Sequence, residues 1–240
     1  MVSTAYHRLL ATIAALGSLL ALAVVVLLPS PAQAAVTCDP DYPASVATTT
    51  SIRVSPPVGR YGTRAVATVR VTSDAGEPGG VVVVSVAGES RTFDRLDDGV
   101  ARVTLPRGLA AQETYLVGAR YLGRGCYDES FDSTTYTVMR STLRIVGLDA
   151  RDIRRGGHPF VSGRIITSTG VAANGRVTVR IGTDGDIRAR ETVTLRGGRF
   201  AVRFDRVYET GRWVAQVIKA GSRNYTGDSD TTVFRVRGRR

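Results

Sequence analysis

A short closing segment occurs twice in this chain of 240 residues, and its spacing sets the size of the folding unit. The first copy, residues 121–127, reads YLGRGCY, and the second copy, residues 219–225, reads KAGSRNY. Each copy ends on a tyrosine and leads into a strand-like segment rich in Thr. The two tyrosines, Tyr127 and Tyr225, lie 98 residues apart (225 − 127). A period of about 100 residues suits one β-sandwich per copy.

Short segments with alternating apolar and polar residues fill the chain from residue 51 onward, and turns rich in Gly, Asp and Asn separate them. Such segments are typical of β-strands, and no stretch after residue 35 has sustained helical periodicity. The predicted strands are 51–54, 64–71, 81–86, 91–93, 100–105, 115–121 and 134–139, then 142–146, 160–167, 176–181, 187–195, 200–204, 213–219 and 231–236. They predict an all-β fold with a spacer at 36–50 and two tandem sandwiches, at 51–140 and 141–240.

Alternation also predicts which side chains face the core. In the second repeat they are Val177, Val179 and Ile181 on one strand, and Trp213, Ala215 and Val217 on another. Residues 81–84 of the first repeat depart from the pattern, because four consecutive valines make both faces of the strand apolar. Either a loop covers Val81 and Val83, or these two side chains mark an interface with another protein.

The first 35 residues have the pattern of a secretory signal. An apolar run from Leu9 to Leu28 is followed by Pro29 and Pro31 and by Ala-Gln-Ala at 32–34, the spacing that signal peptidase recognises. The apolar run, about 20 residues, is also long enough for an uncleaved anchor helix. Both alternatives place the rest of the chain outside the membrane, either secreted or on the outer face of the cell envelope.

Export makes the two cysteines informative. Cys38 and Cys126 are the only cysteines of the chain, and an even count in an oxidising compartment predicts a disulfide. Closing a loop of this size contributes about 4–5 kcal/mol by the loop-entropy model. Two cysteines and one histidine beyond the signal, His158, do not complete a zinc shell, so we expect no metal site and no cofactor.

At this point the chain resembles the bacterial Ig-like repeat domains of surface and secreted proteins. The likeness lies in the Thr-rich first strand at 48–53, in the alternating valines after Gly80 and Gly175, and in the loop at 221–225, which reads GSRNY. The first repeat departs from this loop, with Cys126 in the Asn position. The resemblance implies an immunoglobulin-like (Ig-like) sandwich used as a spacer, stalk or adhesive unit without enzymatic activity. It identifies no ligand.

The sequence offers little for catalysis. It contains no Gly-x-Ser-x-Gly elbow, no phosphate-binding Walker loop, no paired-histidine helix and no dinucleotide fingerprint. Short-spaced carboxylates at 97–98 and at 184 and 186 have the chemistry of a calcium site, but both groups fall in predicted hairpin turns. Asp is favoured there for backbone reasons alone. We therefore expect a protein that is not an enzyme.

Charge is distributed unevenly between the repeats. Residues 36–140 carry 11 basic and 12 acidic side chains, whereas residues 141–240 carry 20 basic and 9 acidic ones. By alternation four arginines of the second repeat face outward on two strands of one sheet, namely Arg176, Arg180, Arg235 and Arg237. Such a surface attracts anionic polymers with salt-sensitive affinity. The alternative is a solvated basic face without a partner.

Two candidate partners follow. The first is an anionic polymer of the cell envelope, bound through the four arginines. The second is an extracellular protein that this chain would bind through Val81 and Val83, acting as an adaptor or inhibitor. Specific nucleic-acid binding is not expected, because outward aromatic residues do not interleave with the arginines and export removes the chain from DNA. Membrane contact is expected only through an uncleaved N-terminal segment.

Overall fold

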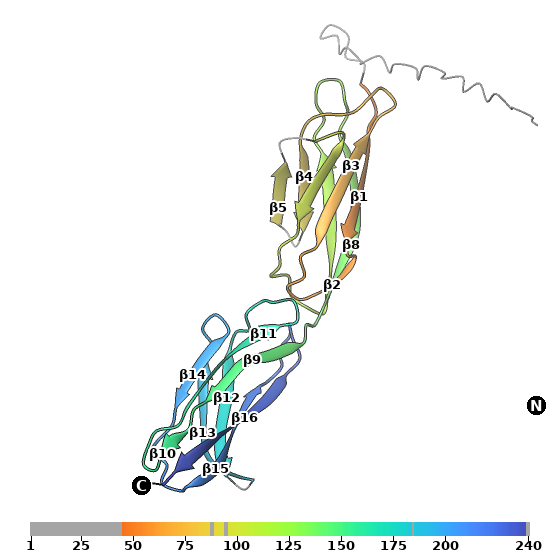
Figure 1. Ribbon diagram of the computed structural model, residues 1–240. Helices are drawn as coiled ribbons and strands as arrows, with labels where there is room; N and C mark the ends of the chain where they lie inside the picture. Colours follow the sequence, from red (N-terminus) through yellow and green to blue (C-terminus); the bar gives the residue numbers. More distant parts are fainter. Residues whose placement is uncertain (1–44, 87–88, 94–95, 184, 239–240) are drawn as a thin grey trace, which may run out of the picture. The chain divides into compact units, whose positions relative to one another are not determined.

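The computed structural model describes residues 45–86, 89–93, 96–183 and 185–238, and every regular element in these ranges is a β-strand (Figure 1). The strands form four sheets, two of three strands and two of five strands, which make two β-sandwiches. The predicted all-β fold is confirmed. The predicted signal or anchor at 1–35, Cys38 and the spacer up to residue 44 lie outside the described residues. Among the described residues, no helix is long and apolar enough to cross a membrane.

The first sandwich contains eight strands. They are β1 (Thr49–Ser55), β2 (Val58–Arg60), β3 (Val66–Thr72), β4 (Val82–Val86), β5 (Glu89–Phe93), β6 (Val100–Thr104), β7 (Glu113–Tyr121) and β8 (Ser130–Met139). One sheet has the order β1-β3-β6 and the other the order β2-β8-β7-β4-β5. This division of sequential strands between two sheets is that of an Ig-like sandwich.

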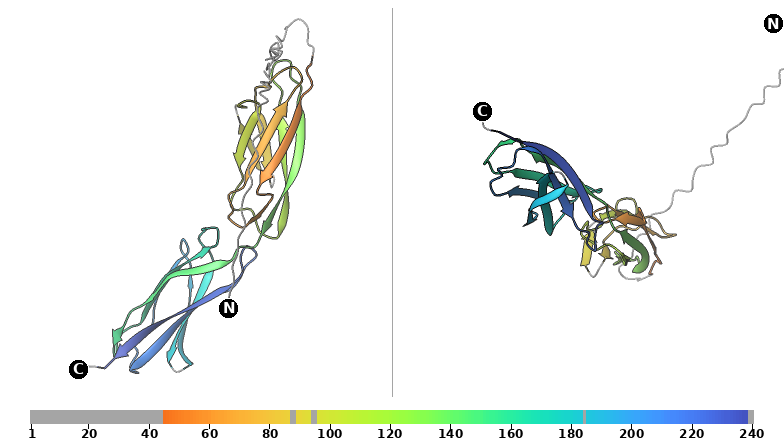
Figure 2. Two further views of the ribbon diagram at one scale, coloured as in Figure 1. Left: turned by 45° about the vertical axis from the view of Figure 1, so that its right-hand side comes forward. Right: turned by 90° about the horizontal axis from the view of Figure 1, so that it is seen from below.

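The second sandwich repeats this arrangement strand for strand. Its strands are β9 (Leu143–Ala150), β10 (Ile153–Arg154), β11 (Phe160–Thr167), β12 (Arg176–Thr183), β13 (Asp186–Thr194), β14 (Arg199–Arg203), β15 (Gly211–Lys219) and β16 (Asp228–Arg237). The sheets have the orders β14-β11-β9 and β10-β16-β15-β12-β13. Within each sandwich the two sheets face one another (Figures 1 and 2).

All fourteen predicted strands are present, although their ends shift by up to four residues. The structure adds two short strands that sequence analysis missed, β2 and β10. Each pairs in parallel with the last strand of its sandwich. Strands of two or three residues are too short to display the alternation from which the others were predicted.

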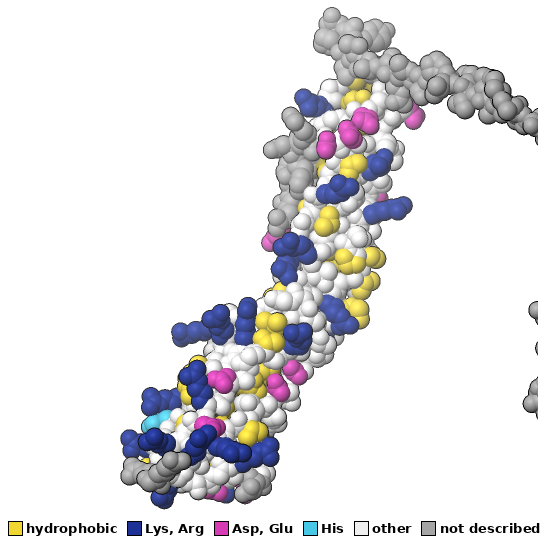
Figure 3. Space-filling model, viewed as in Figure 1, with side chains coloured by type: hydrophobic (Ala, Val, Ile, Leu, Met, Phe, Trp, Pro, Cys, Tyr) yellow, Lys and Arg dark blue, Asp and Glu magenta, His cyan; other side chains and the backbone are white. Residues whose placement is uncertain are grey.

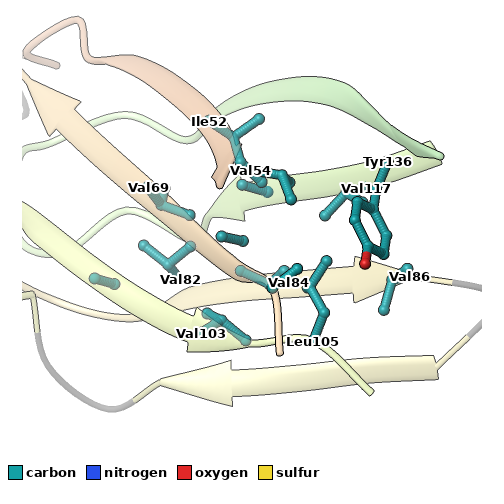
Figure 4. Packing of buried hydrophobic residues seen from close by; sticks show 14 of the residues in the cluster. Ile52, Val54, Val69, Val82, Val84, Val86, Val103, Leu105, Val117 and Tyr136 are labelled. Carbon is teal, nitrogen blue, oxygen red and sulfur yellow. The ribbon is translucent and has the colours of Figure 1, made fainter. Parts of the chain in front are cut away.

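Side chains that alternate along the strands fill one core in each sandwich. Figure 4 shows the first core, where Val69 and Val84 from opposite sheets meet. The predicted inward faces of β12 and β15 are confirmed, and Val179, Ala215 and Val217 are fully buried. Burying a valine side chain stabilises the fold by about 1.5–3 kcal/mol.

The four-valine segment occupies the start of β4, which lies between β5 and β7. Val81 and Val83 are half-buried, whereas Val82 and Val84 are in the core. The exposed apolar side chains of this sheet are on neighbouring strands instead, where Leu116 and Phe131 are each 64% exposed. The second alternative for Val81 and Val83, an interface with another protein, remains a prediction.

The repeated tyrosine segment closes the start of each sandwich. In the first, Val46 pairs with Tyr127, and the Val46 amide donates to the Cys126 carbonyl at 2.7 Å. In the second, Ser141 pairs with Tyr225, and its amide donates to the Asn224 carbonyl at 3.0 Å. The segment therefore joins the chain ahead of the first strand to the loop before the last one.

This pairing brings the described start of the chain beside the loop that holds Cys126. Eight residues separate Val46 from Cys38, so the loop lies within reach of the predicted partner. Because Cys38 lies outside the described residues, the Cys38–Cys126 disulfide remains a prediction.

Candidate functional site

The four predicted arginines lie on the five-stranded sheet of the second sandwich. Arg176 and Arg180 belong to β12, Arg235 and Arg237 belong to β16, and β15 runs between the two strands. Three of them are exposed, and Arg180 is half-buried. Their neighbours in sequence, among them Val177, Val179, Phe234 and Val236, point into the core, so period-2 alternation turns the arginines toward solvent.

The four arginines are spread along the sheet and do not form one cluster. Arg180 is in register with Gln216 of β15, which is in register with Thr231 of β16. From that row, Arg176 lies four residues away in one direction and Arg237 six residues away in the other. At about 3.3 Å per residue, Arg176 and Arg237 are roughly 30 Å apart along the strands. A short anionic group cannot contact both.

Two arginines that sequence analysis did not select complete the basic face. Arg190 of β13 stands directly opposite Arg180, and Arg212 of β15 stands directly opposite Arg235. Among the described residues, none of these four side chains forms an ion pair. Like charges directly opposite each other destabilise a sheet, so each pair has a repulsion that a bound anion would relieve.

We call these four residues, Arg180, Arg190, Arg212 and Arg235, the arginine-pair face. Alternation along β13 could have identified Arg190 as outward-facing, because it is three residues before Val193, which packs against the core. That it faces Arg180 depends on the register of β12 against β13, which the single sequence does not specify.

A small hollow adjoins Arg180 on this face. It has a volume of about 230 Å³, and its lining includes Val214, Gln216 and Thr231. The Arg180 Nε is buried there and has no hydrogen-bond partner among the described residues. A buried donor without an acceptor is costly, which favours an incoming oxygen ligand. Asp186 also lines the hollow and lies 3.9 Å from Arg188.

Arg237 differs from the arginine-pair face because it has a counter-charge. Its guanidinium lies 2.6 Å from a carboxylate oxygen of Asp152, and the Arg235 amide donates to the other oxygen at 2.8 Å. These hydrogen bonds, that from the Arg237 side chain first, lower the pKa of Asp152 below its usual value. Arg237 is therefore partly neutralised, whereas the Arg235 side chain interacts with Asp152 only by a longer-range attraction and forms no ion pair with it.

Basic side chains also gather elsewhere on the second sandwich. Figure 3 shows Lys and Arg over the part of the surface where Figure 1 places β9, β11 and β14, with few acidic side chains among them. The excess of basic residues counted in the second repeat is therefore present on both sheets of this sandwich.

Sequence analysis considered His158 and the short-spaced aspartates as candidates for catalysis or metal binding. His158 Nδ1 lies 2.9 Å from the Phe204 carbonyl, and its other ring nitrogen lies 3.4 Å from Arg206 Nε. Asp97 and Asp98 lie in the turn before β6, and Asp184 is outside the described residues. Within the described ranges, no three His, Cys, Asp or Glu side chains are grouped as metal ligands.

No family model and no curated protein matches this chain. Solved structures similar to it include a tetra-tandem repeat from the extending region of a large adhesion protein, with 17% identity, a TM-score of 0.41, and coverage of 80% of this chain and 49% of that chain. A two-domain fibronectin type III segment of chicken tenascin has 12% identity and a TM-score of 0.39, covering 78% and 98%. A 1.5-MDa bacterial ice-binding adhesin has 19% identity and a TM-score of 0.32, covering 81% and 65%. This chain spans about half the length of the first of these structures. With TM-scores below 0.5, the similarities carry no argument about function.

Proposed function

We propose that this chain is an exported, non-enzymatic Ig-like module of a bacterial cell surface, and that its second sandwich binds an anionic polymer of the envelope. The observation that carries the proposal is the arginine-pair face, where two pairs of like charges stand opposite each other and no member forms an ion pair among the described residues. A spacer without a ligand gains nothing from this arrangement, because each pair lowers the stability of the sheet.

The chemistry of the face suits a polymer better than a compact ligand. The two pairs occupy different rows of the sheet, so a linear chain of anionic groups contacts both while a single group contacts one. Each exposed arginine contributes on the order of 1 kcal/mol near an anionic surface, so that binding requires several together. Because three of the four arginines are exposed, we expect the affinity to fall steeply as salt shortens the Debye length.

The test is retention of the full chain on washed cell envelopes at low salt. A variant with Arg180→Ser, Arg190→Ser, Arg212→Thr and Arg235→Thr should be washed off, and moderate salt should release the wild type. A matched control removes the same charge from the first sandwich, at the exposed arginines Arg53, Arg64, Arg70 and Arg102, and should remain bound. Equal retention of both variants at every salt concentration would show that the arginine-pair face does not bind the envelope.

A second candidate function is docking of an extracellular protein by the first sandwich, as an adaptor or inhibitor. The observation behind it is the apolar exposure of Leu116 and Phe131, on the same face as Val83. Substitution of both with Ser should abolish capture of such a protein and leave envelope retention unchanged. Loss of envelope retention in this variant would instead mean that the first sandwich holds the protein on the cell.

A further inference from the structure

A second hollow of this sandwich lies over the sheet with the order β14-β11-β9 and reaches the end of β13. It is a groove of about 720 Å³, and three arginines line it together with apolar residues. The arginines are Arg164 of β11, Arg199 at the start of β14, and Arg196 in the hairpin before β14. No acidic residue lines the groove.

The groove forms where the pairing of β9 with β11 is interrupted by a β-bulge. Ser162 pairs with Asp149 and Arg164 pairs with Val146, so two residues of β9, Gly147 and Leu148, oppose one residue of β11. Gly147 has a φ of 61°, the left-handed conformation that this bulge requires and that glycine adopts without strain. A bulge beside a binding site re-aims side chains and breaks the regular surface of the sheet.

A close contact beneath the groove fixes its floor. The residue of β11 at the bulge is Gly163, and a Cβ there would lie 2.9 Å from Cζ of Phe200. The Phe200 ring therefore occupies the space of the absent side chain, and Phe200 itself is buried. Above this floor Gly147 leaves the surface without a side chain, since a Cβ there would have no atom within 4 Å.

The arginines stand around this floor in a defined register. Arg164 is directly opposite Arg199, so this sheet also contains a cross-strand pair of like charges. Arg196 is held by the hairpin, where its amide donates to the Arg199 carbonyl at 3.0 Å and its carbonyl accepts from the Arg199 amide at 3.0 Å. None of the three side chains has an ion-pair partner among the described residues. The nearby Asp149, which pairs with Ser162 of β11, lies 3.4 Å from Arg151 instead.

At the matching positions the first sandwich lacks the bulge and two of the three arginines. The strand pair β1 and β3 continues in register without a bulge. The backbone pairings match Arg164 with Arg70, Arg199 with Val100, and Arg196 with Asp97. The first sandwich therefore has one arginine, one valine and one aspartate where the second has three arginines. The two hairpins have the same backbone pairing.

We propose that this groove is a binding site for an oxyanion, a phosphate or carboxylate group joined to an uncharged organic moiety. Guanidinium groups bind both oxyanions through paired hydrogen bonds, and a ligand here would relieve the repulsion between Arg164 and Arg199. Val146 and Val193, which also line the groove, would contact the organic part. The inference does not depend on the proposed function, because the arginine-pair face lies on the other sheet.

The experiment is a calorimetric and NMR titration of the full chain with phenyl phosphate and, separately, with benzoate. These probes present the two oxyanions on the same ring and so distinguish the phosphate source from the carboxylate source. The test variant introduces the first sandwich's residues, Arg196→Asp and Arg199→Val. We expect it to bind the preferred probe at least about tenfold more weakly, since hydrogen bonds to charged groups are lost. The control variant, Arg180→Ser with Arg190→Ser, should bind as the wild type does.

A second variant keeps the test decisive if the first fails to fold. Arg199→Lys retains the charge and removes the planar fork, and it should weaken binding while leaving the melting temperature nearly unchanged. The proposal is overturned if wild type binds neither probe, or if all three variants bind both probes with the affinity of the wild type. It is also overturned if the control loses affinity and the groove variants do not, because the oxyanion would then be bound on the arginine-pair face.

Discussion

The two sandwiches have the same strand order and differ at matching positions of their outer faces. Where Arg180 faces Arg190 in the second sandwich, Ser85 stands in register with Ser90 in the first. Where Arg212 faces Arg235, Thr114 faces Thr137, and the two threonine hydroxyls are hydrogen-bonded at 3.0 Å. At these two places the first sandwich therefore has uncharged residues in register, whereas the second has pairs of like charge.

The comparison separates what specifies the fold from what specifies function. The inward positions stay apolar in both sandwiches, for instance Tyr136 and the matching Phe234, because the core must be filled in each. The outward positions do not affect packing, and here the chain has changed neutral or mixed residues to arginine. In our proposals, the binding surfaces are the outward positions at which the two repeats differ.

The largest expected effect concerns the loop of the repeated tyrosine segment, where Cys126 matches Asn224. Replacing Cys126 with Asn should lower the free energy of unfolding by about 4–5 kcal/mol, because the predicted disulfide no longer constrains the unfolded chain. Reduction of the wild type should reproduce the loss in denaturant unfolding. Two thiols that react with an alkylating agent in unreduced, denatured protein would show that the disulfide does not form.

The next effect concerns the pair beneath the groove, Gly163 and Phe200, which matches Val69 and Ala101 of the first sandwich. Phe200→Ala should lower the free energy of unfolding by about 3–5 kcal/mol by opening a cavity. Gly163→Val should cost about 1–3 kcal/mol by overpacking against the ring.

Combining the two changes gives the second sandwich the pair that the first one has. The double variant should therefore be more stable than the sum of the single changes predicts, a coupling that thermal or denaturant unfolding measures. If the losses of stability in the two single variants simply add in the double variant, the valine–alanine pair does not substitute for the glycine–phenylalanine pair.

A smaller effect of opposite sign is expected at the arginine pairs. Arg180→Ser with Arg190→Ser should raise the free energy of unfolding by about 0.2–1 kcal/mol at low salt, since a pair of opposed like charges is removed. The gain should disappear at high salt as the repulsion is screened. Destabilisation of the variant at low salt would contradict the repulsion that we infer.

The smallest expected effect is on the free energy of unfolding at acid pH, and it again differs between the two sandwiches. In the second, the Arg235 amide donates to the Asp152 carboxylate, whereas in the first the matching Thr137 amide donates to the carbonyl of Pro57. The lowered pKa of Asp152 stabilises the fold above the unfolded pKa, about 3.9. This contribution is lost as the pH falls through the lower folded value.

Arg237→Ser should therefore move the Asp152 pKa upward toward its usual value, as followed by carboxyl NMR. The acid limb of the stability curve should become less steep in Asp152→Asn. An Asp152 pKa that is the same with and without Arg237 would show that the ion pair does not form in solution.

Sequence analysis predicted the fold well because its signals are local. Alternation along β12 and β15 placed Val179 and Ala215 in the core. Gly-rich segments marked the turns, among them the hairpin at Gly197 and Gly198, where both residues have positive φ. Such patterns depend on neighbouring residues, so a single sequence contains them. The strands β2 and β10 were missed because two or three residues carry no pattern.

The proposed binding surfaces depend on register, which a single sequence does not specify. Sequence analysis selected Arg176 and Arg237, which lie at opposite ends of the sheet, and did not select Arg190 or Arg212, which face other arginines. The groove was not predicted at all, since it arises from a bulge that brings residues of three separate segments together. Charge counts identified the basic sandwich without distinguishing its two sheets.

The most direct test of the central claim is the salt dependence of binding of the full chain to inorganic polyphosphate of defined length. The logarithm of the association constant should fall linearly with the logarithm of the salt concentration, with a slope that reflects the arginines engaged. We expect a shallower slope and a weaker affinity for the variant with Ser or Thr at Arg180, Arg190, Arg212 and Arg235. The matched variant of Arg53, Arg64, Arg70 and Arg102 should keep the wild-type slope. If the two variants have the same slope, the affinity follows net charge alone, and the arginine-pair face is not a binding site.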